Sequence, residues 1–239
     1  MTLNIKSTGR GKPLVLFHGW GFDQTIWFDL AESIQNRFNV FMVDLPGFGK
    51  SSMMSWDSFK AQLRTNLPDN FAVLGWSLGG LYATRLAAEE ELHVTHLINV
   101  ASSPRFIADK GWPGIDEKIL ATFYNNLIQD PQQTMMQFIE LQLQTREYKL
   151  RPDLLPSVDG LQDGLQILAN WDLREALRNL KCPTCYMFGR LDAIVPRTLK
   201  TVMQTEYAHF DYVLFNRAAH VPFLSDKAMF IEELERFLL

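Results

Sequence analysis

The segment 75–79 reads Gly-Trp-Ser-Leu-Gly, and an apolar run, 71–74, leads into it. A helix-forming segment, 81–91, follows it. In a strand, turn and helix of this kind the glycines allow the backbone to fold back tightly, and the serine stands at the tip of the turn. A serine hydroxyl placed there can attack an acyl carbon while nearby amides hold the resulting oxyanion. The spacing therefore predicts a nucleophile at Ser77.

Two further residues complete a candidate catalytic triad. Asp192 and His220 lie just after two apolar segments, 184–188 and 211–215, which we expect to be strands. The carboxyl ends of parallel strands line one crevice, and the chain order Ser, Asp, His is that of α/β-hydrolases. His220 would then take the proton from Ser77, and Asp192 would fix the imidazole tautomer. Weaker alternatives are Asp211 and Asp226 as the acid and His209 as the base.

The loop at 18–21, His-Gly-Trp-Gly, follows another predicted strand at 13–17. α/β-hydrolases place the second amide of the oxyanion hole in a loop of this kind. We therefore expect the amides of Trp20 and Leu78 to face the oxyanion. His18 is expected to bond to the backbone and to take no part in proton transfer.

These residues need a scaffold in which strands and helices alternate. Apolar runs predict buried strands at 39–45 and 97–103. Apolar residues at helical spacing predict helices at 23–38, 56–67, 172–180, 196–207 and from 226 to the end. The expected fold is a single α/β-hydrolase domain with a mostly parallel central sheet and helices on both faces.

The stretch from about 104 to 171 interrupts this alternation, because strand-like runs disappear from it. Helices are predicted at 116–128, 131–144 and 154–169, the last interrupted by Pro156 and glycines. We expect an inserted helical cap here, and a core made of 1–103 and 172–239. The cap has more apolar side chains than three short helices need for packing against one another, so some of them should face the catalytic cleft.

The chain has 239 residues, of which 47% are hydrophobic, and a formal net charge of −4. This size suits one domain with a large core. A small negative net charge does not indicate a basic surface that binds nucleic acid. The sequence shows neither a signal peptide nor an apolar run of about 18 residues. We therefore expect a cytoplasmic monomer that binds small esters and neither nucleic acid nor membrane.

Three short patterns that suggest metal or phosphate sites are incomplete. The C-x-x-C pair at 182–185 has no second cysteine pair, and the H-x-x-H pair at 93–96 lacks the spacing of a zinc-protease helix. The Gly-Lys-Ser at 49–51 ends a phosphate-loop pattern whose first glycine is replaced by Asp44. We expect no metal and no cofactor.

Six segments carry a resemblance to a known family. They read His-Gly-Trp-Gly at 18–21, Asp-Leu-Pro-Gly-Phe-Gly at 44–49, Gly-Trp-Ser-Leu-Gly-Gly at 75–80, Val-Ala-Ser-Ser-Pro at 100–104, Trp-Pro-Gly-Ile at 112–115 and Ala-Ala-His at 218–220. Together they make the chain similar, nearly end to end, to the pimeloyl-[acyl-carrier protein] methyl ester esterases of biotin synthesis. These are serine carboxylesterases with a Ser-Asp-His triad.

The resemblance implies hydrolysis of the methyl ester of pimeloyl-[acyl-carrier protein] to methanol and pimeloyl carrier protein, through an acyl-enzyme on Ser77. It implies that Ser77, Trp20, Leu78 and His220 touch the substrate. It also implies an acyl channel formed by the cap residues Phe138, Ile139, Glu140, Leu141 and Gln142. The carrier protein is acidic, and the cap residues that could meet it with positive charge are Lys118, Arg146, Lys149 and Arg151.

Two departures from the family concern the cap. The cap is shorter between Gln142 and Leu161 than is usual in the family. The helix predicted at 131–144 carries Gln132, Gln133 and Gln137 where arginines facing the carrier would be expected.

Other functions share these motifs. The tight turn at Ser77 and the predicted triad also suit a general short-chain carboxylesterase, a hydrolase that breaks carbon–carbon bonds, or an enzyme of the menaquinone-pathway type. A non-catalytic receptor with a hydrolase fold is a further alternative, which an intact triad argues against.

Overall fold

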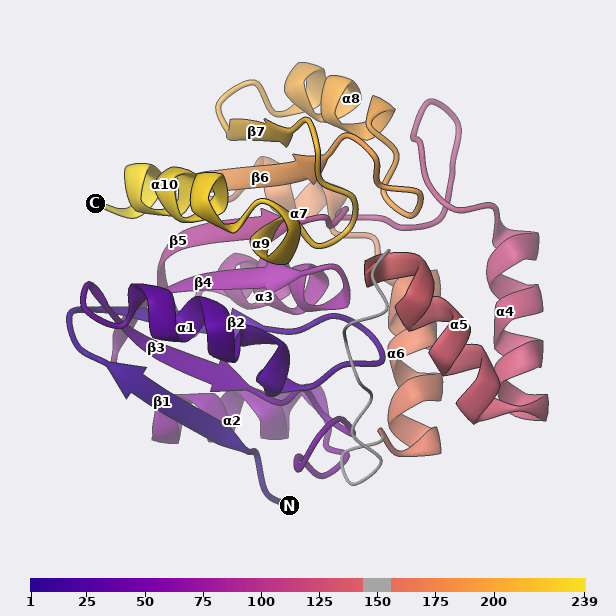
Figure 1. The fold of residues 1–239 in the computed structure, drawn as a ribbon, viewed down its shortest axis with the longest axis horizontal. Helices are drawn as coiled ribbons and strands as arrows, with labels where there is room; N and C mark the ends of the chain where they lie inside the picture. Colours follow the sequence, from indigo (N-terminus) through magenta and orange to yellow (C-terminus); the bar gives the residue numbers. More distant parts are fainter. Residues whose placement is uncertain (144–155) are drawn as a thin grey trace.

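The computed structural model describes residues 1–143 and 156–239, and a seven-stranded sheet runs through its centre (Figure 1). The strand order is β1-β3-β2-β4-β5-β6-β7. The strands are β1 (Ile5–Gly9), β2 (Lys12–Phe17), β3 (Phe38–Val43), β4 (Asn70–Trp76), β5 (His93–Val100), β6 (Thr184–Gly189) and β7 (Asp211–Phe215). Neighbouring strands pair in parallel except β1, which is antiparallel to β3. The predicted, mostly parallel α/β sheet is confirmed.

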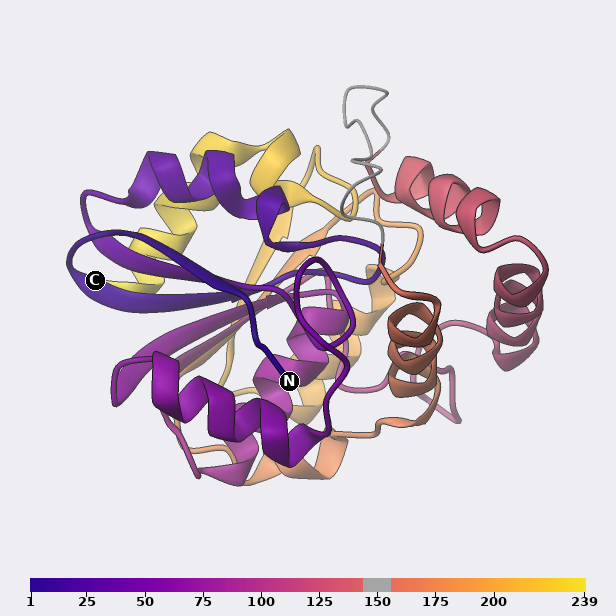
Figure 2. The ribbon, with the colours of Figure 1, turned by 90° about the horizontal axis from the view of Figure 1, so that it is seen from below.

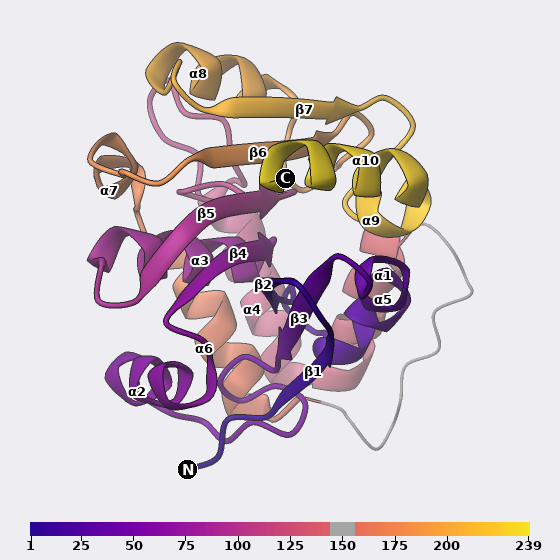
Figure 3. The same ribbon diagram turned by 90° about the vertical axis from the view of Figure 1, so that its left-hand side faces the viewer.

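Helices cover both faces of this sheet, as predicted. Helices α1 and α10 lie on one face, and α2, α3 and α7 lie on the other (Figures 2 and 3). The helical elements are η1 (Gln24–Trp27), α1 (Phe28–Ile34), α2 (Trp56–Asn66), α3 (Leu78–Glu89), α4 (Glu117–Gln129), α5 (Pro131–Leu143), α6 (Val158–Asn170), α7 (Arg174–Arg178), α8 (Thr198–Glu206), α9 (Pro222–Ser225) and α10 (Lys227–Leu238). None of the helices in the described ranges is long and apolar enough to cross a membrane.

The central strands are apolar on both sides because helices bury both faces of a parallel sheet. Every residue of β4 after Asn70 is buried, and so are all six residues of β6. Continuous burial of this kind explains why these strands could be found from apolar runs alone. Each of them ends at the edge of the sheet where the predicted catalytic residues lie.

Helices α4, α5 and α6 lie between β5 and β6 in the chain and next to the carboxyl edge of the sheet (Figure 1). The Asp116 side chain caps α4 by accepting a hydrogen bond of 2.8 Å from the Lys118 amide. Ser157 caps α6 in the same way through the Gly160 amide, at 3.0 Å. These two caps set where the helices begin, because each satisfies an amide that lacks an intrahelical acceptor.

Helix α6 is continuous, whereas the sequence predicted that glycines would interrupt it. Its glycines allow close packing instead. A β-carbon on Gly160 would lie 2.3 Å from the Gly47 carbonyl oxygen, and one on Gly164 would lie 2.7 Å from the Trp20 ring. The favourable packing of α6 on the core offsets the poor helix propensity of glycine, which costs about 1 kcal/mol per residue.

Several elements differ from the sequence prediction; the helix predicted at 23–38, for example, consists of η1 and α1 and ends at Ile34. Strand β1 was not predicted, because Ile-Lys-Ser-Thr-Gly shows no apolar alternation, and its backbone pairing with β3 holds it in place. Strand β5 begins at His93, four residues before the predicted start at 97, and the short helix α9 was missed. The candidate cap cations Arg146, Lys149 and Arg151 lie outside the described residues.

Candidate active site

Ser77 stands at the turn between β4 and α3 in a conformation that few residues other than glycine adopt. Its φ is 54° and its ψ is −116°. The turn is so tight that a β-carbon on Gly75 would lie 2.2 Å from the Gly79 carbonyl oxygen, and one on Gly79 would lie 2.3 Å from the Phe17 carbonyl oxygen. Backbone strain of this kind persists only where the surroundings enforce it, and it is common at functional sites.

Hydrogen bonds on both sides of the serine hold this strained turn. The Ser77 amide donates to the Val100 carbonyl at 3.0 Å, which fixes the turn to the end of β5. The buried Ser102 hydroxyl donates to the Ser77 carbonyl at 2.8 Å. Sequence reasoning did not assign this role to Ser102, because the spacing of residues does not reveal how the two loops cross. Ser77 is therefore held on both its amide and its carbonyl by the chain at the end of β5.

Asp192 and His220 meet directly. The Asp192 Oδ2 lies 2.8 Å from His220 Nδ1, and both side chains are almost completely buried. The other oxygen, Oδ1, accepts hydrogen bonds from the amides of Ile194 at 2.8 Å and Val195 at 3.0 Å. A carboxylate held in this way can only accept from Nδ1. Neutral His220 then carries its proton on Nδ1 and leaves Nε2 free to take a proton.

The backbone of His220 is joined to the residue that precedes Ser77. Trp76 Nε1 donates to the His220 carbonyl at 2.8 Å, and the two rings lie 5.7 Å apart. His220 Nε2 is buried and has no hydrogen-bond partner among the described residues, so it is not bonded to Ser77 here. Such contacts are often long before substrate binds. Ser77 itself is only 3% exposed, so the site is shielded from bulk water.

The alternative acids and base do not reach this centre. Asp211 begins β7 and therefore lies at the opposite end of that strand from His220. Asp226 occupies the N-cap position of α10, and its side chain caps no amide there. His209 is exposed beyond the end of α8.

The two predicted oxyanion-hole residues, Trp20 and Leu78, are buried. Leu78 is the first residue of α3, so its amide has no intrahelical acceptor. The Trp20 side chain is fully buried and donates from Nε1 to the Leu161 carbonyl at 2.8 Å, which joins the loop to α6. The Trp20 ring also packs edge-on against Phe123 and Phe138, at centroid distances of 5.4 and 5.2 Å.

The five cap residues at 138–142 do not share one orientation. Ile139 and Gln142 are buried and Phe138 is half-buried, whereas Glu140 and Leu141 are exposed. Helical periodicity explains the split, because two consecutive positions must turn away from the face that packs. Gln142 Nε2 donates to the Phe138 carbonyl at 3.4 Å, and its buried Oε1 has no partner in the described part of the chain.

His18 bonds to the backbone, as predicted. Its Nδ1 donates to the Gly19 carbonyl at 2.8 Å, and its Nε2 accepts from the Leu45 amide at 3.0 Å. Burial lowers the pKa of this imidazole below its ordinary value of 6.5, although the nearby Asp44 and Asp23 partly oppose the shift. The ring is therefore neutral and joins two loops.

The buried His18 should make folding stability depend on pH. Below pH 6.5 the unfolded chain binds a proton that the folded chain resists, so the free energy of unfolding falls as the pH falls. Denaturant unfolding at about pH 7.5 and about pH 5 measures this slope in the wild type and in His18→Gln. The variant should lose part of the slope. An unchanged slope would show that His18 does not titrate on unfolding.

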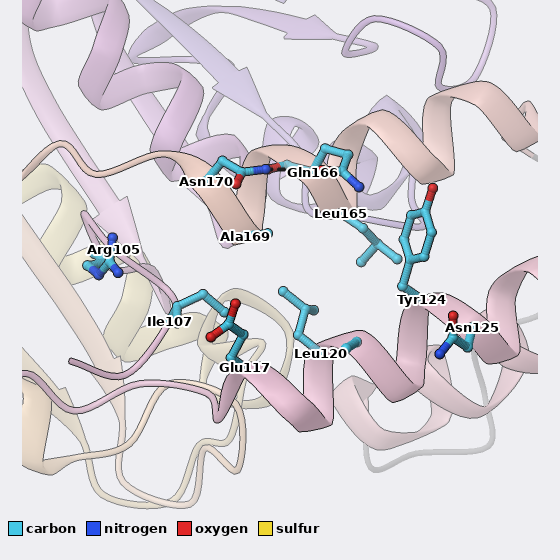
Figure 4. Close-up of a pocket in the computed structure, with 11 residues that line it drawn as sticks. Arg105, Ile107, Glu117, Leu120, Tyr124, Asn125, Leu165, Gln166, Ala169 and Asn170 are labelled. Carbon is cyan, nitrogen blue, oxygen red and sulfur yellow. Dashed lines mark hydrogen bonds between the residues drawn. The ribbon is translucent and has the colours of Figure 1, made fainter.

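A groove of about 470 Å³ lies between α4 and α6 (Figure 4). Apolar side chains such as Leu120 and Leu165 line its floor, and Arg105, Tyr124 and Asn170 stand around it. None of the residues that line it belongs to the predicted site. The groove therefore belongs to the outer surface of the cap helices.

The structure offers no evident place for a metal in the ranges that it describes. No three His, Cys, Asp or Glu side chains gather there as a ligand set. The two cysteines are free, and burial raises the pKa of the Cys185 thiol far above its ordinary value. A buried, protonated thiol is a poor nucleophile.

Comparison with known proteins assigns the fold and the family. The model of the alpha/beta hydrolase family matches residues 14–233. The pimeloyl-[acyl-carrier protein] methyl ester esterase of Legionella pneumophila (strain Corby) is 50% identical over the full length of both chains. This chain belongs to the pimeloyl-[acyl-carrier protein] methyl ester esterase family of alpha/beta hydrolases.

Other members and more distant hydrolases agree with this membership. The family member from Aliivibrio salmonicida is 40% identical, over 99% of this chain and 96% of its own. An esterase from Exiguobacterium antarcticum has a similar structure, with a TM-score of 0.86 at 22% identity over 98% of this chain and 94% of the esterase. The protein is thus a hydrolase of the esterase class, as the sequence predicted.

Proposed function

We propose that this esterase hydrolyses the methyl ester of pimeloyl-[acyl-carrier protein], releasing pimeloyl-[acyl-carrier protein] and methanol in biotin synthesis. The observation that carries the proposal is full-length identity of 50% to an enzyme of that name. The buried Asp192–His220 pair next to a strained serine turn supplies the chemistry that such an ester needs.

In the first half of the reaction, Ser77 Oγ attacks the ester carbonyl carbon while His220 Nε2 takes the hydroxyl proton. Asp192 holds the imidazole through Nδ1 and stabilises its positive charge. The oxyanion that forms accepts hydrogen bonds from the amides of Trp20 and Leu78. Collapse of this intermediate breaks the carbon–oxygen bond to the methoxy group, which leaves as methanol with the proton from His220.

In the second half, water attacks the acyl-enzyme. His220 Nε2 removes one proton from the water, and the second tetrahedral intermediate collapses to a carboxylic acid and free Ser77, which regains that proton. Ser77, Asp192 and His220 are all nearly covered, so bulk water screens little of the charge that develops on them. No metal or cofactor takes part in this scheme.

The acyl chain would pass beside three aromatic rings. The rings pack pairwise at centroid distances of 5.1 to 5.4 Å, and they belong to Trp20, Phe123 and Phe138. Ile139 and the buried Gln142 lie on the same side of α5. We assign these side chains to the acyl channel and the exposed Glu140 and Leu141 to the cap surface. The core made of 1–103 and 172–239 then holds the triad, and the cap at about 104–171 selects the acyl chain.

The proposed substrate can be tested directly. The purified protein should release methanol from carrier-bound pimeloyl methyl ester, and its gene should restore growth of a biotin auxotroph that lacks its own methyl esterase. Ser77→Ala should do neither, because it lacks the nucleophile. If the wild type cleaves chromogenic short-chain esters but leaves the carrier-bound ester intact and does not restore growth, the protein is a general carboxylesterase.

A further inference from the structure

A second strained turn lies beside the turn at Ser77, at the end of the neighbouring strand β5 (Figure 1). Ala101, the first residue beyond β5, has a φ of 45°, which its β-carbon disfavours. Ser77 itself has a φ of 54°. Within residues 1–143 and 156–239 the remaining non-glycine residue with a positive φ is Glu90, at the end of α3, where such a φ is common. Ala101 ends no helix, so its strain has another cause.

The turn at Ala101 brings the side chain of Ser102 to the backbone of the proposed nucleophile. The Ala101 amide donates to the Met187 carbonyl of β6 at 2.8 Å, which fixes the turn to the sheet. Ser102 is 1% exposed, and its hydroxyl donates to the Ser77 carbonyl at 2.8 Å. Gly80 leaves room for this hydroxyl, because a β-carbon there would lie 2.2 Å from Ser102 Oγ. Two strained turns thus meet through one buried hydrogen bond.

The Ser77 carbonyl also accepts a hydrogen bond from the Gly80 amide, at 2.9 Å. That bond lies within the first turn of α3, so it moves with the helix. The bond from Ser102 comes from the chain beyond β5, so it ties the same carbonyl to the sheet. If the Ser102 hydroxyl were removed, the carbonyl would keep the Gly80 amide as a partner, which limits the cost to folding. The contribution of Ser102 is therefore one of direction.

The peptide group that Ser102 holds also carries the Leu78 amide. The Ser77 carbonyl and the Leu78 N–H belong to one planar trans unit, so they point in opposite directions. Leu78 begins α3, and its amide has no acceptor within the helix. A hydrogen bond to the carbonyl fixes the direction of the amide and also polarises the N–H as a donor. Ser102 thus acts on the group that holds the oxyanion in the proposed reaction.

We infer that Ser102 is a positioning residue for the oxyanion hole. Its hydroxyl orients and polarises the peptide group between Ser77 and Leu78, so that the Leu78 amide stabilises the oxyanion of both tetrahedral intermediates. This inference rests on the proposed function, in which Ser77 is the nucleophile. The effect grows as negative charge develops on the substrate oxygen, and both half-reactions pass through such a state. Loss of the hydroxyl should therefore lower kcat and leave KM unchanged.

Ser102→Ala tests this role on a free chromogenic short-chain ester. Removal of an oxyanion-hole donor costs about 100-fold to 1,000-fold in kcat, so a donor that is only misdirected should cost about tenfold. KM should stay at the wild-type value. Rates are taken per site titrated with a fluorophosphonate, which reacts with Ser77, so that a smaller folded fraction does not count as slower chemistry.

A transition-state analogue separates positioning from folding. A trifluoromethyl ketone with the same acyl chain forms a reversible adduct with Ser77 Oγ, and the oxygen of the adduct occupies the oxyanion hole. Its inhibition constant should rise about tenfold in Ser102→Ala, in step with the fall in kcat, because both report the same hydrogen bond. A change that affected only folding would leave the inhibition constant of the folded enzyme unaltered.

Ser103→Ala is the matched control, because Ser103 is equally buried and its hydroxyl donates to the Arg105 carbonyl at 2.5 Å. It should keep the wild-type kcat and inhibition constant. The inference is overturned if Ser102→Ala lowers kcat no more than Ser103→Ala does, or if kcat falls while the inhibition constant stays the same. Full activity of Ser77→Ala on this ester would refute the proposed nucleophile, and the role of Ser102 with it. Failure of the wild type on the carrier-bound ester would refute only the proposed substrate, since every measurement here uses free compounds.

Discussion

Ser77→Ala and His220→Ala are each expected to lower kcat on every ester by about 10⁴-fold or more, because the triad acts as a unit. Asp192→Asn should cost a comparable factor. An amide at position 192 could present its NH₂ group to His220 Nδ1, which would then carry no proton, so the proton would move to the nitrogen that must act as base. Steady-state turnover of a chromogenic short-chain ester measures all three.

The same experiment includes a test of whether the three residues act together. If they do, Ser77→Ala/His220→Ala should be no slower than Ser77→Ala alone, since the remaining rate comes from binding and from the oxyanion hole. Asp211→Asn and His209→Ala are matched controls, because they change the same residue types at exposed positions. Both should keep wild-type rates. Near-normal activity of Asp192→Asn, with loss in Asp211→Asn, would show that the acid is misassigned.

Much of the fold could be predicted because strands that are buried on both faces of the sheet are continuous apolar runs in the sequence. Strands such as β4 and β6 are apolar throughout, so their ends, and the residues just beyond them, were located closely. The edge strand β1 leaves no such trace, since two of its five residues are partly covered and three are exposed. Its place comes from backbone pairing, which residue types do not encode.

The meeting of Asp192 with His220 could be predicted from topology, whereas the contacts that hold the turn at Ser77 could not. Parallel strands bring their carboxyl ends together whatever lies between them in sequence, so Ser77, Asp192 and His220 could be grouped without a structure. The hydrogen bond from Ser102 to the Ser77 carbonyl depends on how two loops cross, and no spacing reveals it. The orientation of α5 is also set by packing, which is why Glu140 and Leu141 face outward.

Phe138→Asp should narrow the range of acyl chains that the enzyme accepts. The ring of Phe138 lies 5.2 Å from that of Trp20 and 5.1 Å from that of Phe123, so a carboxylate there would enter an apolar cluster. Filling an apolar channel is worth about 0.8 kcal/mol for each methylene buried. In the wild type, kcat/KM for methyl esters should therefore rise a few-fold with each added carbon until the channel is full.

In Phe138→Asp this rise should be lost, because an ionised carboxylate keeps water in the channel and opposes entry of the chain. Long-chain methyl esters should lose at least about 100-fold in kcat/KM, whereas acetyl esters, which need only the triad and oxyanion hole, should lose far less. Phe138→Leu keeps the site apolar and should retain most of the trend. Met136→Asp adds the same charge at an exposed position of α5 and should change nothing. An equal loss on acetyl and long-chain esters in Phe138→Asp would mean that α5 only covers the triad, and that acyl selection lies elsewhere.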